Sequence, residues 1–292
     1  MKLHLLKKKK INFRKYLINN SRLNLSQITK LSYDLQAGNY IKNFKKTLKN
    51  KKLNQIHNKN INNFFKYIKN ENIKTFLDFG TGEANRLIEI LKYNKNIKKL
   101  FGCDISFNRL SVGFDYLNRE LNNNDLSKIT LFCNEDFILP FKKNSIDIIS
   151  TIGCLENMSN NKMNKIIIEL LRVAKKKLIL IEPRNKNITK KELKRMKKLK
   201  LNYNLNNVLV KNKLSFVEDE WFKYYQNKTP YSMRIISKTL KKPINNYKFY
   251  LNKENYPLIK RNNFYFSQTG RIIPVINNIS IFRSLDGLNY IE

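Results

Sequence analysis

Between residues 73 and 183 the chain alternates short apolar runs with longer amphipathic segments, and this alternation limits the folds it can adopt. Strands joined by helices of about ten or more residues form βαβ units, which lie in a parallel sheet. The apolar runs are continuous, as expected for strands covered by helices on both faces. The predicted strands are KTFLDFG, IKKLFGCDIS, SKITLFCNEDF, SIDIISTIGCLE and KLILIEP, and the predicted helices are EANRLIEILKYN, FNRLSVGFDYLNRELNNN and NKMNKIIIELLRVAKK.

The segments on either side divide the chain into three predicted parts. Residues 1–30 form a basic N-terminal extension. Residues 31–243 form the main α/β domain, with two helices over residues 31–72 before the alternating region. After that region come a partly helical segment and two antiparallel strands, LSFVEDEWFKYY and YSMRIISKTL, which close the sheet. Residues 244–292 combine short aromatic and β-branched runs with Asn and Gly, which predicts a small β-rich tail.

The chain is strongly basic, with 58 Lys and Arg against 22 Asp and Glu and a net charge of +36. Such a charge indicates either an RNA or membrane-surface partner or a bias in composition. Lys, Asn and Ile crowd the whole chain and share A/T-rich codons, and the lysines are spread rather than gathered in one stripe. We therefore favour compositional bias and keep RNA as the alternative partner.

The cysteines and histidines argue against metal and nucleophile chemistry. Cys103, Cys133 and Cys154 stand far apart without a C-x-x-C pair, so a disulfide framework and a zinc site are both disfavoured. His4 and His57 lie beside no motif, which disfavours a Ser-His-Asp site. We predict no metal. No apolar run reaches the roughly 18 residues of a membrane span, and we expect a reducing, cytoplasmic location.

The stretch FLDFGTGEANRL, residues 76–87, joins the first strand to its helix at the edge where α/β sheets bind ligands. Gly80 and Gly82 let the backbone pass close to a ligand. The dinucleotide fingerprint G-x-G-x-x-G requires a third glycine where this chain has Asn85, and the P-loop pattern is absent. The remaining alternatives are a different nucleoside ligand, with Asp78 and Thr81 in the turn, or a glycine-rich turn with a structural role only.

Acidic residues follow the next two predicted strands. Asp104 lies 22 residues after Gly82 (104 − 82), where a carboxylate can accept hydrogen bonds from ribose hydroxyls. Its alternative role is to cap the following helix. Asp136, in the NEDF stretch with Glu135 and Phe137, could accept a hydrogen bond from an adenine amino group, and its alternative role is that of a turn acid.

These residues resemble the motifs of a known family. The D-x-G-x-G form of Asp78–Gly82 resembles motif I of class I S-adenosylmethionine (SAM) dependent methyltransferases. The segment LPFKKNSIDIISTIGCLENM resembles the LPF…SFD…LEH stretch of the type 11 branch, with Asn157 in place of the usual histidine. SYDLQAGNY resembles the cap helix that precedes motif I in a subgroup of bacterial members. The resemblance covers roughly residues 31–242.

The resemblance implies a Rossmann-like, seven-stranded methyltransferase sheet with N-terminal cap helices and a small C-terminal β appendage. It implies SAM as cofactor. The tail resembles, without its cysteines, the small zinc-ribbon-like activator of tRNA and release-factor methyltransferases. The implied cofactor-binding residues are Asp78, Gly80, Thr81, Gly82, Asp104, Ile105, Glu135, Asp136 and Phe137, and the candidate catalytic residues are Glu156, Tyr33 and Tyr40.

The predicted function is methyl transfer from SAM to an oxygen or nitrogen of a small molecule, sugar or lipid-linked intermediate. The alternatives are an RNA or protein methyltransferase and an inactive SAM-fold binding protein. The sequence predicts neither the acceptor nor the oligomeric state.

Overall fold

The central sheet contains all seven strands that the sequence predicts. The computed structural model describes residues 12–69, 71–135, 137–184, 188–221, 230–238, 249, 257–267, 271–282 and 288–289. The sheet order begins β6-β7-β5-β4-β1-β2-β3. Strands β1 to β5 are parallel, and β7 at one end is antiparallel to both of its neighbours, β5 and β6. The strands are β1 (Thr75–Phe79), β2 (Lys99–Asp104), β3 (Ile129–Asn134), β4 (Ile146–Ile152), β5 (Ala174–Pro183), β6 (Val217–Trp221) and β7 (Tyr231–Ser237).

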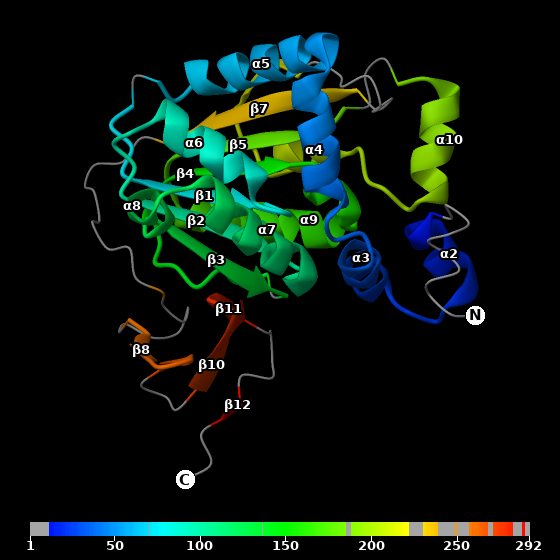
Figure 1. Ribbon diagram of the computed structural model, residues 1–292. Coiled ribbons are helices and arrows are strands. Elements are labelled where there is room, and N and C mark those ends of the chain that lie inside the picture. The colour runs from blue at the N-terminus through cyan, green and yellow to red at the C-terminus, as the bar shows by residue number, and fades with distance from the viewer. Residues whose placement is uncertain are drawn as a thin grey trace.

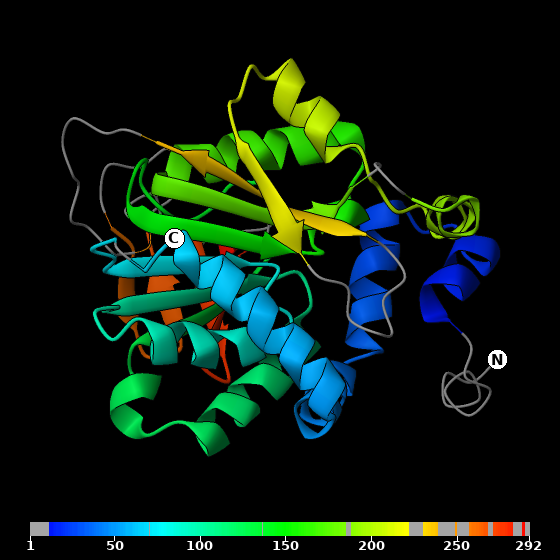
Figure 2. The same ribbon diagram turned by 90° about the horizontal axis from the view of Figure 1, so that it is seen from above.

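Helices cover both faces of the sheet (Figures 1 and 2). One face carries α5 (Lys51–Lys66), α6 (Asn85–Tyr93) and α7 (Phe107–Glu120), followed by the short α8 (Asn123–Leu126). The other carries α9 (Asn160–Val173) and α11 (Leu205–Lys211), while α10 (Lys190–Lys198) lies beside the N-terminal helices. The predicted α/β fold class is confirmed. None of the described helices is long and apolar enough to cross a bilayer.

Each face has its own apolar core. On the α6 side, Leu87 and Ile90 pack with Phe76 and Leu110, all with no exposed surface. On the α9 side, Ile167 and Leu170 pack with Leu77, also fully buried. Burying one such side chain contributes about 1.5–3 kcal/mol, so the two cores fix the sheet between its helices.

The strand order reverses at β1, which lies between β2 and β4. In sheets of this kind the ligand site lies outside the carboxyl ends of the strands at this reversal. The backbone N–H groups of Gly80 and Thr81 both donate to the carbonyl oxygen of Cys103, at 2.7 and 2.8 Å. The turn after β1 is therefore attached to the end of β2.

The N-terminal region is more ordered than the sequence predicts. It contains α2 (Phe13–Asn20), α3 (Leu25–Asp34) and α4 (Asn39–Lys49) before α5. The two helices predicted over residues 31–72 are instead parts of three, separated at Gly38, which has φ 91°, and at Asn50. The predicted end of the basic extension at residue 30 falls inside α3.

Arg14 explains why α2 packs on the domain rather than extending from it. Its side chain is 6% exposed. Its Nε donates to the carbonyl oxygen of Leu199 at 2.8 Å, and its Nη1 donates to Thr29 Oγ1 at 3.1 Å and to Asn157 Oδ1 at 3.0 Å. The described part of the predicted extension, residues 12–30, therefore packs on the domain through partners far along the chain, which leave no local pattern.

The C-terminal tail extends the main sheet. Beyond β3 the strand order continues β11-β10-β9-β8, and β12 pairs with β10. β11 runs parallel to β3, from Ile279 opposite Leu131 to Phe282 opposite Asn134. The tail is thus a β-meander, as predicted, but it joins the sheet and is not a separate appendage. Its strands are β8 (Ile259–Arg261), β9 (Phe264–Phe266), β10 (Arg271–Ile276), β11 (Ile279–Phe282) and β12 (Leu288–Asn289).

Aromatic packing reinforces this strand pairing. Phe282 is 6% exposed, and its ring centroid lies 5.7 Å from that of Phe132 and 5.2 Å from that of Phe249. β11 also covers the edge of β3, whose N–H and C=O groups would otherwise be open to pairing with another chain. The division predicted at residue 243 lies outside the described residues and stays a prediction.

We predict that Phe282→Ala destabilises the whole domain. Truncating a buried phenylalanine costs about 3–5 kcal/mol, and here the loss would fall on the contact between tail and sheet. Ile276→Ala, in the neighbouring strand at a position that is 48% exposed, is the matched control and should change stability by about 0.5 kcal/mol or less. Urea unfolding of the three proteins measures the effect, and equal stability of all three would contradict the packing described.

Candidate active site

The turn after β1 requires residues that tolerate a left-handed backbone. Gly80, Gly82 and Ala84 have φ of 77°, 62° and 55°. A Cβ on Gly80 would lie 2.5 Å from the Sγ of Cys154, and a Cβ on Gly82 would lie 2.1 Å from Nη2 of Arg109. The two glycines are therefore required both by conformation and by close approach, whereas Ala84 tolerates its φ at the start of α6.

Asp104 supports this turn from the end of β2. It is 6% exposed, and its Oδ2 accepts a hydrogen bond from the backbone N–H of Gly82 at 2.9 Å. Its Oδ1 accepts from the N–H of Ser106, also at 2.9 Å. The cap of α7 is Ser106, whose Oγ accepts from the N–H of Arg109. The alternative role of Asp104 as helix cap is therefore wrong, and its carboxylate faces the cavity described below.

Asp78 is occupied by neighbours within the chain. Its carboxylate accepts hydrogen bonds from Thr81 Oγ1 at 2.9 Å and Ser150 Oγ at 3.1 Å, and it pairs with the guanidinium of Arg86. Arg86 balances the charge of Asp78, and the hydrogen bond from Thr81 to Asp78 holds the turn in place.

A cavity of about 530 Å³ opens over the turn, within the usual 300–1,000 Å³ range of small-molecule sites. It brings together residues from β1, β2, the loop after β3 and the cap helices. Gly82 and Glu156 do not line it, and Asp136 lies outside the described residues. The predicted site residues that line it are Tyr33, Tyr40, Asp78, Gly80, Thr81, Asp104, Ile105, Glu135 and Phe137.

Two carboxylates hold the cap helices over this cavity. Glu83, fully buried beside the turn, accepts hydrogen bonds from the backbone N–H groups of Gly38, Tyr40 and Ile41 at 2.9, 3.2 and 2.7 Å. These groups lie at the start of α4, where unpaired N–H groups and the helix dipole favour an anion. On α3, Asp34 Oδ1 accepts from Ser106 Oγ at 2.6 Å. The cap helices are thus attached to the turn after β1 through Glu83 and to the loop after β2 through Ser106.

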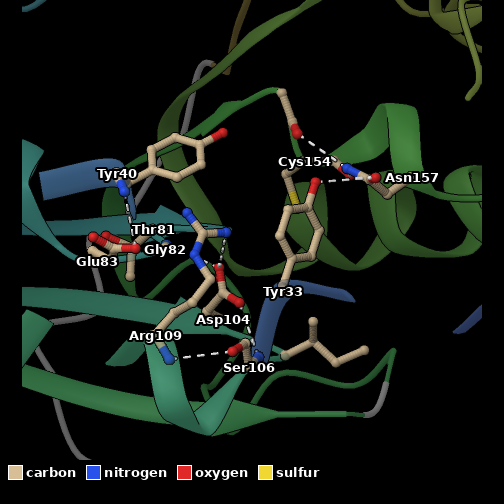
Figure 3. Close-up of polar contacts among 12 residues, drawn as sticks. Tyr33, Tyr40, Thr81, Gly82, Glu83, Asp104, Ser106, Arg109, Cys154 and Asn157 are labelled. Atoms are coloured by element: carbon tan, nitrogen blue, oxygen red, sulfur yellow. Dashed lines mark hydrogen bonds and ion pairs between the residues drawn. The ribbon is translucent and has the colours of Figure 1, made fainter. Parts of the chain in front are cut away.

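Tyr33 and Tyr40 lie at the cavity as predicted, on either side of Arg109 (Figure 3). The Tyr33 hydroxyl donates to Asn157 Oδ1 at 3.1 Å. Burial, with smaller contributions from Tyr40 and Glu156, raises the pKa of Tyr33 well above its ordinary value. Tyr33 is therefore a neutral hydrogen-bond donor at physiological pH and not a base. Tyr40 is 53% exposed at the edge of the cavity.

Glu156 does not have the catalytic position that the sequence predicts. Its carboxyl group is hydrogen-bonded to the Tyr231 hydroxyl outside the cavity lining. Burial, followed by the charge of Glu182, raises the pKa of Glu156 to about 8. Glu182 accepts hydrogen bonds from Thr151 Oγ1 at 2.8 Å and from the N–H groups of Cys154 and Leu155 at 3.1 Å each. Because its side chain lies outside the cavity lining, Glu156 is not placed to act as a general base on a molecule bound there.

The sequence reading missed a histidine–carboxylate pair in the cavity wall. His57 Nε2, on α5, is hydrogen-bonded to Glu89 Oε1, on α6, and both side chains line the cavity. The Phe44 ring packs edge-on against the imidazole, with the centroids 5.4 Å apart. The two residues lie 32 positions apart on different helices, so no local motif could reveal the pair. A carboxylate in this position orients an imidazole by fixing which ring nitrogen faces it.

Comparison with known proteins agrees with this geometry. Residues 77–181 match the family model described as a methyltransferase domain. A demethylmenaquinone methyltransferase of Porphyromonas gingivalis is 29% identical over 89 residues, which are 30% of this chain and 35% of that protein. The chain thus spans about a third of the length of this curated relative.

Solved structures show the same fold at low identity. Magnesium protoporphyrin IX methyltransferase from Synechocystis PCC 6803, with bound SAM, has 14% identity and a TM-score of 0.54, covering 75% of this chain and 100% of that one. Geranyl diphosphate C-methyltransferase from Streptomyces coelicolor A3(2) has 10% identity and a TM-score of 0.51, covering 64% and 81%. The predicted methyltransferase fold is confirmed, and the family match supports SAM as cofactor.

The raised pKa of Glu156 predicts a pH dependence of stability. Between the ordinary value of 4.5 and about 8, the folded protein keeps a proton that the unfolded chain releases. The stabilisation that this proton provides is therefore complete below pH 4.5 and is lost as the pH rises towards 8. Glu156→Gln, which is neutral at every pH, should gain stability relative to the wild type across this window, by about 1.4 kcal/mol per pH unit at most.

Melting temperatures at pH 5, 6.5 and 8 measure this effect. Glu220→Gln, at an exposed position of β6, is the matched control and should run parallel to the wild type. Parallel curves for Glu156→Gln as well would show that Glu156 ionises normally.

Proposed function

We propose that this chain, whose residues 77–181 match the methyltransferase domain family, transfers a methyl group from SAM to a small organic acceptor held beneath the cap helices. The observation that carries the proposal is the extent of the cavity. One continuous cavity joins the Gly80 turn and Asp104 to His57 and Glu89 under α4 and α5. Cofactor and acceptor can therefore meet in one cavity.

The residues around the turn suit an adenosyl ligand. Asp104 uses its oxygens on two backbone N–H groups and keeps lone pairs for ribose hydroxyls. Ile105, Glu135 and Phe137 line the end of the cavity that suits the adenine ring. Bound there, SAM would supply an electrophilic methyl group on its sulfonium.

Two parts of the chain position the loop at the adenine end. The side chain of Glu135 forms an ion pair with Lys30 of the cap at 2.5 Å. Its backbone N–H donates to the carbonyl oxygen of Phe282 in the tail strand at 3.1 Å. The cap and the tail therefore both hold the loop that follows β3.

The other end of the cavity suits an acceptor with an apolar body. Phe44, Ile61 and Trp221 line it, together with His57 and Glu89. Alignment of nucleophile and methyl group supplies most of the acceleration in such a displacement. A hydroxyl or protonated amine must also lose a proton, and His57, oriented by Glu89, is the residue that we assign to accept it.

A small acceptor fits this cavity better than RNA does. Among the described residues that line it, four are carboxylates, Asp78, Glu89, Asp104 and Glu135, and three are cations, Lys162, Arg109 and Arg86, of which Arg86 is paired with Asp78. A phosphate backbone is contacted mainly through lysine and arginine. The methyltransferases reported above are named for demethylmenaquinone, magnesium protoporphyrin IX and geranyl diphosphate, all small molecules.

Asp104→Asn should weaken binding of S-adenosylhomocysteine about tenfold or more. A hydrogen bond to a charged group contributes about 1.5–3 kcal/mol, and about 1.4 kcal/mol is a factor of ten in affinity. Asp115→Asn, at an exposed position of α7, is the control and should bind as the wild type does. Isothermal titration measures both variants. Unchanged affinity in a folded Asp104→Asn protein would remove Asp104 from the cofactor site.

His57→Gln should slow methyl transfer by about 10²–10⁴-fold, the usual contribution of a general base. Its affinity for S-adenosylhomocysteine should stay within about twofold of the wild type, because His57 lies at the acceptor end. Transfer of label from methyl-labelled SAM into small-molecule fractions of a cell extract measures the rate. Asn58→Gln, exposed on the same helix, is the control. Full activity of His57→Gln would assign the pair a structural role only.

A further inference from the structure

Arg109 is a buried cation whose guanidinium has no hydrogen-bond acceptor in the described part of the chain. Its side chain is 7% exposed, and its Nε is enclosed without a partner. The Asp104 carboxylate lies 3.9 Å from Nη1, which is an ion-pair distance but too long for a hydrogen bond. Asp104 already accepts the N–H groups of Gly82 and Ser106.

Two tyrosines stabilise the charge without satisfying its donors. The guanidinium carbon lies 4.8 Å from the centroid of the Tyr33 ring and 4.3 Å from that of the Tyr40 ring (Figure 3). Cation–π attraction of this kind stabilises the charge in part. A desolvated charge remains costly unless it is also hydrogen-bonded. A guanidinium that lines the cavity with its buried Nε unsatisfied suits an anion that arrives from outside the chain.

The position of Arg109 limits which anion that is. Its side chain lines the cavity, and its Nη2 lies directly over Gly82, within 2.1 Å of where a Cβ would stand. The other arginine of the cavity, Arg86, already pairs with Asp78. Arg109 thus lies at the glycine turn within ion-pair distance of Asp104 but with its buried Nε unsatisfied.

We propose that Arg109 binds the carboxylate of the cofactor's methionine half. This inference rests on the proposed function, in which the amino-acid end of SAM lies over the glycine turn. That end carries the one carboxylate of the molecule, beside an ammonium and a sulfonium that are both positive. A guanidinium can hold a carboxylate through two parallel N–H···O bonds. Tyr33 and Tyr40 would then enclose the ion pair from the cap side.

Arg109 also gives a reason for the link between cap and turn. Because Glu83 fixes the start of α4, it sets the position of Tyr40 over the guanidinium. Asn157 fixes the Tyr33 hydroxyl in the same way. The two rings hold Arg109 at the turn, where an extended side chain would otherwise be free to turn towards solvent.

The test compares two ligands that differ in the carboxylate alone: S-adenosylhomocysteine and its decarboxylated analogue, S-adenosyl-3-thiopropylamine. Isothermal titration gives the affinity of each for the wild type, Arg109→Met and Arg109→Lys. Arg119→Met, exposed near the end of the same helix, is the matched control. We expect the wild type to prefer S-adenosylhomocysteine at least tenfold. Arg109→Met should lose that preference by weakening S-adenosylhomocysteine alone, and Arg109→Lys should retain part of it.

Other outcomes overturn the assignment. Equal weakening of both ligands in Arg109→Met would make Arg109 a structural support. Unchanged or tighter binding of S-adenosylhomocysteine would mean that the guanidinium serves an anionic acceptor or obstructs the cofactor. If Arg109→Met fails to fold, equal affinity of the wild type for the two ligands is sufficient to refute the proposal. A wild type that binds neither ligand would refute the proposed function itself, which is a different result.

Discussion

The enclosed site depends on one buried carboxylate, that of Glu83. It lies in the turn after β1 and accepts three backbone N–H groups from the start of α4, at 2.7 to 3.2 Å. Hydrogen bonds to a charged group contribute about 1.5–3 kcal/mol each, so this contact can hold a helix that has a single buried apolar residue, Ile41. Because Asp104 fixes the same turn from β2, the geometry of the turn and the position of the cap are set together.

Features encoded locally could be predicted from the sequence. The seven strands of the main sheet follow from continuous apolar runs, and the parallel direction of the first five follows from the βαβ alternation. The turn at Gly80 and Gly82 could be predicted because both residues have positive φ angles, which glycine adopts most readily. Asp104, Ile105, Glu135 and Phe137 line the cavity because the carboxyl ends of parallel strands are also the ligand edge of the sheet, and their binding of a cofactor stays a prediction.

Features that depend on contacts between distant segments could not be predicted. His57 meets Glu89, and Arg14 meets Leu199, only after the helices pack. Glu156 was misjudged because a position at the end of a strand does not say whether the side chain turns towards the cavity or into the protein. The tail was recognised as β-rich, but nothing in its residues indicates that β11 pairs with β3. That pairing connects the tail to the loop of Glu135.

Equilibrium binding of S-adenosylhomocysteine to the wild-type protein, measured by isothermal titration beside NAD⁺, tests the central claim most directly. The glycine turn lacks the third glycine of the dinucleotide fingerprint, and the cavity places Asp104, the tyrosine pair and Arg109 around one adenosyl-sized space. We expect one molecule of S-adenosylhomocysteine bound per chain, with a dissociation constant in the micromolar range, and no binding of NAD⁺. Binding of NAD⁺ without S-adenosylhomocysteine would contradict it.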